Sequence, residues 1–324
     1  MDQWSSDFLM RSPMFEPLRP FGAALCSPQW PTLYDLQRAA DAREPRVLTR
    51  GGAPLHFVEQ GARAAAFEDK YEMRIYLKGE VQIRAANWHD LLNALVWLTF
   101  PRAKAALNER HYLALRKQQA AGAPNRGPEQ DVMTLFDESG VIVVASDDEL
   151  LGQIREFKWK ELFWRNRARV ESAMRFFLFG HALYEKALRP FTGRAGAWSR
   201  GHVLRGCDGE GVHEPEIQSD ALQPAPGSHL PASRQALLNR PRATGRGMLF
   251  QVGADFFPAP LVVQLERLDA MLAQRLLDTA ALKSTRDLAP VPILGVPGWC
   301  ADNARESYYD NVEYFRPGRA PGPR

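Results

Sequence analysis

The amino-acid sequence predicts a single α+β domain that is mainly helical and has a small, mostly antiparallel sheet. Three observations favour this class. Apolar residues recur at helical spacing in residues 87–100 and 261–281, residues 71–78 alternate, and two apolar arms flank a turn rich in Asp, Ser and Gly in residues 134–144. A period near 3.6 residues is typical of a helix, and a period of two is typical of a half-buried strand.

Length, charge and cysteine content limit the class of protein. The chain has 324 residues, enough for a large core, and 41 Lys and Arg against 38 Asp and Glu give a formal net charge of only +3. This balance does not favour a dedicated nucleic-acid-binding protein. Cys26, Cys207 and Cys300 are far apart and form no CxxC pair, so we expect neither a disulfide framework nor a structural zinc site.

Targeting and membrane patterns are not evident. The N-terminus lacks a basic start followed by an apolar run, and the most apolar window, residues 91–100, is about half of the roughly 20 residues that span a bilayer. We therefore expect a soluble cytoplasmic protein with no membrane partner. Small-molecule and protein partners both remain open.

The first part of the chain is expected to combine a wrapping segment with short regular elements. Residues 1–35 are rich in Pro and aromatic residues and are expected to cover the core in extended form. Thr32 is the expected cap of a helix, and residues 56–59 are an expected strand. Residues 71–78 are predicted to be a half-buried strand that Gly79 ends.

Two successive helices follow. Asn87 is a good N-cap for a helix that stops at Phe100 before Pro101, and Asp90 in its first turn suits the helix dipole. Residues 102–117 are predicted to form the second helix. Residues 134–144 are interpreted as a hairpin, and residues 147–157 as a helix that starts with Asp147, Asp148 and Glu149.

Residues 161–188 have a helical pattern that contains Arg165, Arg167, Arg169 and Arg175, the most basic part of the chain. Residues 192–250 are rich in Gly, Pro, Ser and Arg and are interpreted as a loop-like or weakly ordered insertion. Residues 290–299 are expected to be irregular because of their Pro and Gly content. The expected domain covers residues 20–317, and residues 318–324 are an expected flexible tail.

Four blocks of sequence stand out by their order and content. They are Asn87-Trp88-His89-Asp90 through Phe100-Pro101-Arg102 with Lys104 and Asn108; Thr134-Leu135-Phe136-Asp137-Glu138; Phe179-Gly180-His181-Ala182-Leu183-Tyr184-Glu185-Lys186; and Pro292-Ile293-Leu294-Gly295-Val296-Pro297-Gly298-Trp299 with Tyr309-Asp310 and Phe315-Arg316-Pro317. Together they resemble a proteobacterial domain-of-unknown-function family, number 3025 in its series. The resemblance covers about residues 20–317 and is weakest at 192–250. It implies no activity.

The helix of residues 87–100 carries the first group of candidate catalytic residues. His89, Asn93 and Trp97 are spaced by four residues and therefore share one helix face, beside which Asp90 lies. One interpretation is a cleft lined by a His base or ligand, a carboxylate and an amide. The alternative is structural. Asn87 caps the helix, the Asp90 carboxylate interacts favourably with the helix dipole, and His89 and Asn93 form hydrogen bonds with neighbouring backbone groups.

The second group is His181 and Glu185, spaced by four residues on another helix. This spacing suits a shared metal ion, an acid–base pair or a structural pair. No HExxH motif is present, so a metal site made of His181, Glu185 and His89 requires the two helices to face each other. Gly180 permits close approach of another backbone. The identity of any cofactor stays open; a divalent metal ion is one alternative, which the sequence does not favour.

Other polar residues have simpler interpretations. His111 is expected to be exposed, Asp137 and Glu138 to lie at a hairpin tip, and the spacing of His202, Cys207 and His213 is wrong for a zinc finger. Two functions remain. The protein is a non-catalytic or binding protein in which these histidines are structural, or it is a hydrolase-like enzyme, with or without a metal ion, whose cleft is lined by His89, Asp90, His181 and Glu185.

Overall fold

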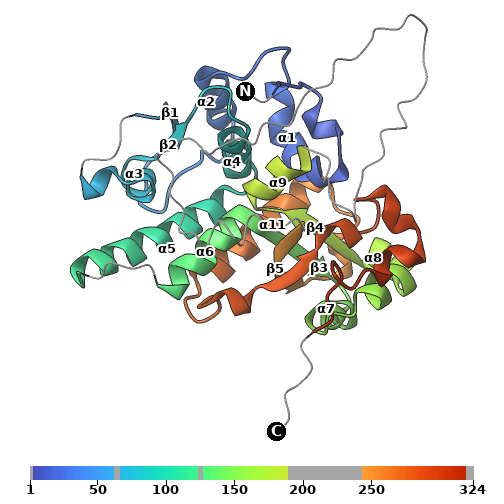
Figure 1. Cartoon of the computed structure of the whole chain (residues 1–324). Coiled ribbons are helices and arrows are strands. Elements are labelled where there is room, and N and C mark those ends of the chain that lie inside the picture. Colours follow the sequence, from blue (N-terminus) through green and yellow to red (C-terminus); the bar gives the residue numbers. More distant parts are fainter. Residues whose placement is uncertain (1–2, 62–65, 123–126, 189–242, 319–324) are drawn as a thin grey trace, which may run out of the picture.

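The computed structural model describes residues 3–61, 66–122, 127–188 and 243–318 (Figure 1). These residues form many helices around a four-stranded sheet, and a separate two-stranded parallel sheet lies to one side. The predicted class, α+β and mainly helical, is confirmed. No helix among the described residues is long and apolar enough to cross a membrane.

The four-stranded sheet lies inside the core and is mixed. Its strands, in spatial order, are β4 (Met174–Leu178), β3 (Gly140–Ala145), β5 (Thr244–Gln251) and β6 (Ala289–Pro292). β3 runs parallel to β5, and the two outer pairs are antiparallel. Every residue of β3 is buried, because helices and loops cover both faces of the sheet. The smaller sheet pairs β1 (His56–Glu59) with β2 (Glu80–Ile83), which confirms the strand expected at residues 56–59.

Helices pack beside the sheet and around one another. The α-helices of the described residues are α1 (Arg19–Gly22), α2 (Leu33–Asp41), α3 (Tyr71–Lys78), α4 (Trp88–Thr99), α5 (Pro101–Ala120), α6 (Pro128–Ser139), α7 (Asp148–Arg155), α8 (Arg167–Ala173), α9 (His181–Leu188) and α11 (Leu261–Leu277). α5 packs against both α11 and α6, and α9 packs against both α4 and α6. Figure 1 shows α9 close to α4 in the middle of the molecule. This arrangement brings α4, α6 and α9 together.

Residues 71–78 form helix α3, so the prediction of a strand was wrong. The alternation was too short to exclude a helix. Gly79 ends the element as expected, but as a left-handed helix C-cap with φ of 73°. A Cβ at this position would lie 1.8 Å from the carbonyl oxygen of Pro54, so this close backbone approach requires glycine. Strand β2 begins directly after it.

Residues 134–139 belong to helix α6, so the predicted hairpin was also wrong. The helix begins at Pro128, a favoured first helical residue, and buries Gln130, Met133 and Phe136 at a spacing of three. Only the second arm of the predicted hairpin is a strand, β3. The expected sheet of residues 71–78 and 134–144 is therefore replaced by β3 and strands from later in the chain.

The sequence pattern predicted one helix over residues 161–188, and this prediction was wrong. These residues form a π-helical turn, η5 (Glu161–Arg165), then α8, β4 and α9. Pairing of β4 with β3 overrides the helical pattern, because it satisfies the backbone of Met174–Leu178 and buries its aromatic side chains. The four arginines consequently lie on three different elements instead of one helix face.

The N-terminal segment enters the core, but not in extended form. It consists of short helical turns, η1 (Phe8–Met10), η2 (Pro13–Leu18), α1 and η3 (Ala23–Leu25), followed by α2 with a capping box at Thr32. Phe8 and Phe15 are fully buried, and Trp4 stacks on Trp88 of α4 with ring centroids 5.0 Å apart. The first turns therefore anchor the start of α4.

The C-terminal part contains more regular structure than expected. Residues 289–292 form β6 and residues 293–295 a short turn, η8 (Ile293–Gly295), followed by the turns η9 (Ala301–Ala304) and η10 (Glu306–Asp310). Residues 192–242 of the expected insertion lie outside the described residues, and so do His202, Cys207 and His213. The end of the expected insertion belongs to strand β5, Thr244–Gln251. Residues 319–324 of the expected tail also lie outside the described part of the chain.

Candidate functional site

Helix α4 presents His89 because its first turn is tightly fixed. Asn87 caps the helix as predicted: its side-chain oxygen accepts a hydrogen bond from the backbone N–H of Asp90 at 3.0 Å. The Asp90 carboxylate accepts bonds from the backbone and the guanidinium of Arg84, at 2.8 Å each. Asp90 is thus engaged with Arg84, and among the described residues no hydrogen bond or ion pair joins its carboxylate to either candidate histidine. The His89 side chain remains about one-third exposed.

Helix α9 places His181 at its first residue. A close backbone approach fixes this position: the N–H of Gly180 donates to the carbonyl oxygen of Gly140 at 2.9 Å. A Cβ at Gly180 would lie 2.5 Å from the backbone nitrogens of Ser139 and Gly140. This confirms that Gly180 permits contact with another backbone, which is the junction between α6 and β3. His181 itself is buried, with a side chain 5% exposed.

The two imidazoles meet between the helices. His89 Nε2 and His181 Nε2 are 3.0 Å apart, and the ring planes are nearly perpendicular. Glu138, in the last turn of α6, brings its Oε2 atom to 3.5 Å from His181 Nε2. One ligand atom from each of His89, Glu138 and His181 lies within 4.8 Å of the other two. Two histidines and one carboxylate therefore converge on one point from three helices.

Glu185 lies on the other side of the His89 ring. Its Oε2 atom is 2.9 Å from His89 Nδ1, and its side chain is 37% exposed. Burial disfavours the charged form of His89, but the hydrogen bond to Glu185 and the nearby Glu138 carboxylate outweigh it, so the pKa of His89 is raised. Glu185 was expected to pair with His181; it instead orients His89.

His181 has the opposite electrostatic environment. Burial and the neighbouring His89 hold the pKa of His181 well below its usual value, so this ring is neutral. Its Nδ1 atom has no hydrogen-bond partner among the described residues. The Oδ2 atom of Asp137 faces it at 4.0 Å, which is longer than a hydrogen bond.

A row of polar side chains, of which Lys104 and Asn93 are buried, continues from Asp137. Lys104 Nζ donates to Asp137 Oδ1 at 2.5 Å and to Asn93 Oδ1 at 2.9 Å, and Asn93 Nδ2 donates to the Tyr71 hydroxyl at 3.0 Å. Burial opposes ionisation of Asp137, but the nearby Lys104 ammonium outweighs it, so the pKa of Asp137 is lowered. The predicted stripe of His89, Asn93 and Trp97 thus faces this polar row, and Trp97 lies beneath Lys104.

Sequence reasoning missed Glu138, Asp137 and Lys104 as members of this group. The acidic pair was predicted to lie at a hairpin tip, whereas it occupies the last turn of α6 with both side chains about 20% exposed. The spacing of Gln130, Met133 and Phe136 is the signal that could have identified the helix. His111 is buried, with 4% of its surface exposed, so the expectation that it is exposed was wrong.

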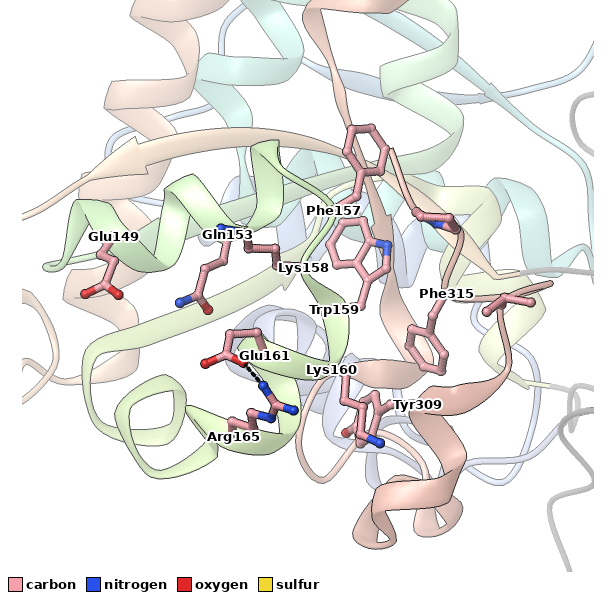
Figure 2. A pocket seen from close by; sticks show the side chains of 12 residues that line it. Glu149, Gln153, Phe157, Lys158, Trp159, Lys160, Glu161, Arg165, Tyr309 and Phe315 are labelled. Carbon is pink, nitrogen blue, oxygen red and sulfur yellow. Dashed lines mark hydrogen bonds and ion pairs between the residues drawn. The ribbon is translucent and has the colours of Figure 1, made fainter. Parts of the chain in front are cut away.

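A surface pocket of about 590 Å³ lies elsewhere, between residues 149–165 and 309–317 (Figure 2). Phe157, Trp159 and Phe315 lie along one side of it, and Figure 2 shows Glu161 paired with Arg165. Its Lys160 forms ion pairs with Glu306 and Asp310. The cations of this pocket are therefore neutralised locally, and none of the candidate site residues lines it.

The fold and the site together define an α+β protein with a His–His–Glu cluster between three helices. The chain belongs to the family described as Protein of unknown function (DUF3025), whose model matches residues 55–214 and 232–319. His89, Glu138 and His181 all lie within the matched residues. No curated protein and no solved structure matches the chain.

Proposed function

We propose that this protein binds one divalent transition-metal ion, with zinc as the best match, through His89 Nε2, His181 Nε2 and a carboxylate oxygen of Glu138. Imidazole nitrogen and carboxylate oxygen are ligands that zinc commonly takes. The single negative charge of the carboxylate would also neutralise part of the charge of the divalent ion. Metal binding is a binding function and requires no catalysis.

The observation that carries this proposal is the separation of the two Nε2 atoms. Two ligands about 2.0–2.1 Å from a tetrahedral zinc ion lie about 3.3 Å apart. The observed distances, 3.0 Å between the Nε2 atoms and 3.5 Å from His181 to Glu138, bracket that value. Small side-chain rotations would therefore be enough to admit the ion.

The Glu185–His89 contact supports the same proposal. A histidine that binds a metal through one ring nitrogen usually donates the N–H of the other nitrogen to a carboxylate or carbonyl. Glu185 accepts from His89 Nδ1, which leaves the Nε2 lone pair of neutral His89 directed at the shared position. Glu185 then acts by orienting a ligand, while Glu138 is the carboxylate that contacts the ion.

Hydrolysis is the second candidate function, and the ligand count favours it. Structural zinc sites usually have four protein ligands, whereas catalytic sites have three and an open position. Only three potential ligands gather here among the described residues, and the partial exposure of His89 and Glu138 gives access from solvent. A zinc ion held by His89, Glu138 and His181 would supply the chemistry of metal-assisted hydrolysis, because it would lower the pKa of a bound water to about 7.

Elemental analysis of protein purified without chelators and reconstituted with zinc tests the proposal. We expect about one zinc per wild-type chain and loss of zinc in His89→Ala, Glu138→Gln and His181→Ala. His56→Ala is the matched control, because His56 lies on β1, outside the cluster. Circular dichroism shows whether each variant is folded. Wild-type protein without stoichiometric zinc, or folded His181→Ala protein that keeps it, would overturn the proposal.

A further inference from the structure

The environment of His181 Nδ1 bears on which ring nitrogen of this buried histidine carries the proton and which is available to the ion. When His89 carries the extra proton, its Nδ1–H donates to Glu185 and its Nε2–H donates to His181 Nε2. Neutral His181 must then carry its own proton on Nδ1. When an ion replaces the shared proton, both Nε2 lone pairs face the ion, and His181 again carries its proton on Nδ1. Both states therefore place an N–H donor opposite Asp137.

We propose that Asp137, held by Lys104, is a positioning residue that fixes the orientation and tautomer of the metal ligand His181. This inference rests on the proposed metal site. Asp137 Oδ2 is the carboxylate oxygen that faces the buried and unpartnered Nδ1 atom, at 4.0 Å. Binding of an ion at Nε2 closes this gap to a charge-assisted hydrogen bond of about 2.7–2.9 Å.

Lys104 supplies the rigidity that this role needs. Its side chain is 5% exposed, so its ammonium requires nearby acceptors, and it finds them in Asp137 and Asn93. The Lys104 bond uses Asp137 Oδ1 and leaves Oδ2 free to face His181. Each site histidine thus has its own carboxylate: Glu185 for His89 and Asp137 for His181. Such carboxylate–histidine–metal arrangements strengthen ligand basicity and fix the ring.

Zinc affinity of the full chain, measured by competition with a chromophoric chelator, tests the role. We expect Asp137→Asn and Lys104→Met each to weaken zinc binding by about 10- to 100-fold, and the double variant to lose little more than either alone, because the two residues act as one unit. Glu129→Gln is the matched control: Glu129 also lies on α6 and pairs with a buried cation of α5, Arg110, away from the metal site. It should bind zinc as the wild type does.

NMR of the zinc-loaded wild-type protein gives a readout that a merely structural role would not move. The Nδ1 proton of His181 is distinguished from that of His89 because Glu185→Gln shifts only the His89 proton. The His181 proton should resonate far downfield and exchange slowly, and in Asp137→Asn it should move upfield and exchange faster. A proton that is unprotected in the wild type, or unmoved in Asp137→Asn, would overturn the positioning role even if Lys104→Met fails to fold. Failure of the wild-type protein to bind zinc would instead refute the proposed metal site itself.

Discussion

His89 and His181 are separated by 92 residues in the sequence, yet their Nε2 atoms lie 3.0 Å apart. Helices α4 and α9 pack against each other and aim the two rings at one point, with Glu138 of α6 beside them. Two ring nitrogens at this distance share either a proton or a metal ion. Competition between the two leads directly to a pH dependence.

Zinc affinity should fall as the pH is lowered through the raised pKa of His89, because the proton occupies the nitrogen that the ion needs. The decline should begin at a higher pH than for an ordinary histidine, whose pKa is about 6.5. Glu185→Gln replaces the charged acceptor of the hydrogen bond that raises this pKa most by a neutral amide. The decline should then move to lower pH, and the affinity at pH 8 should fall by about 10- to 100-fold. Chelator competition at several pH values measures both effects; an identical midpoint in the variant would contradict them.

Zinc should stabilise the folded protein, because the three ligands come together only in the native state. At a free zinc concentration 100 times the dissociation constant, linkage predicts about 2.7 kcal/mol of added free energy of unfolding. Urea denaturation with and without zinc measures this gain. EDTA should reverse it, and His181→Ala should show none. An equal gain in wild type and His181→Ala would indicate binding at another place.

Gly180→Ala should destabilise the protein by about 1–3 kcal/mol, because the new Cβ would overlap the backbone of Ser139 and Gly140. The same displacement separates α6 from α9 and should weaken zinc binding. Gly152→Ala is the matched control: Gly152 lies in helix α7, and nothing lies within 4 Å of its added Cβ. That substitution should stabilise by about 0.5–1 kcal/mol. Similar urea midpoints for the two variants would refute the close-packing argument.

Asp269 of α11 should give the stability a separate pH dependence. Its carboxylate accepts hydrogen bonds from the backbone N–H groups of Arg102 and Ala103, at 3.1 and 2.8 Å, and so caps α5 from another helix. Burial raises the pKa of Asp269 from 3.8 to about 6 despite these bonds. The folded state therefore binds more protons than the unfolded state between these values.

Its stabilising contribution is fully present below pH 3.8 and is lost as the pH rises through about 6. Relative to Asp269→Asn, the wild-type free energy of unfolding should increase by about 2–3 kcal/mol between pH 7 and pH 4. Because the comparison is a difference between two proteins, other titrating groups cancel. Urea denaturation at both pH values measures it, and a constant difference would rule out titration of Asp269 in this range.

Local signals predicted the helices whose ends are marked by strong sequence features. Asn87 and Pro101 bound α4, and Thr32 caps α2, as predicted. Where the pattern was short or its window misplaced, the predictions failed. The apolar residues of 71–78 fit a strand period of two as well as they fit a helix, although the segment is helix α3. Helix α6 begins at Pro128, before the first residue of the segment 134–144 that was predicted to be a hairpin. Within residues 161–188, strand β4 depends on pairing with β3, which no local pattern of residues 174–178 reveals.

The sequence by itself determined two helices that carry titratable side chains, with His89 on one and His181 and Glu185 on the other. It also fixed the small residue, Gly180, at which two backbones meet. The tertiary structure alone decided that the histidines are neighbours, that Glu138 joins them and that Glu185 orients His89 instead of His181. The physical reason is that helix capping and periodicity act over a few residues, whereas a ligand set depends on the packing of α4, α6 and α9, which buries surface from distant parts of the chain.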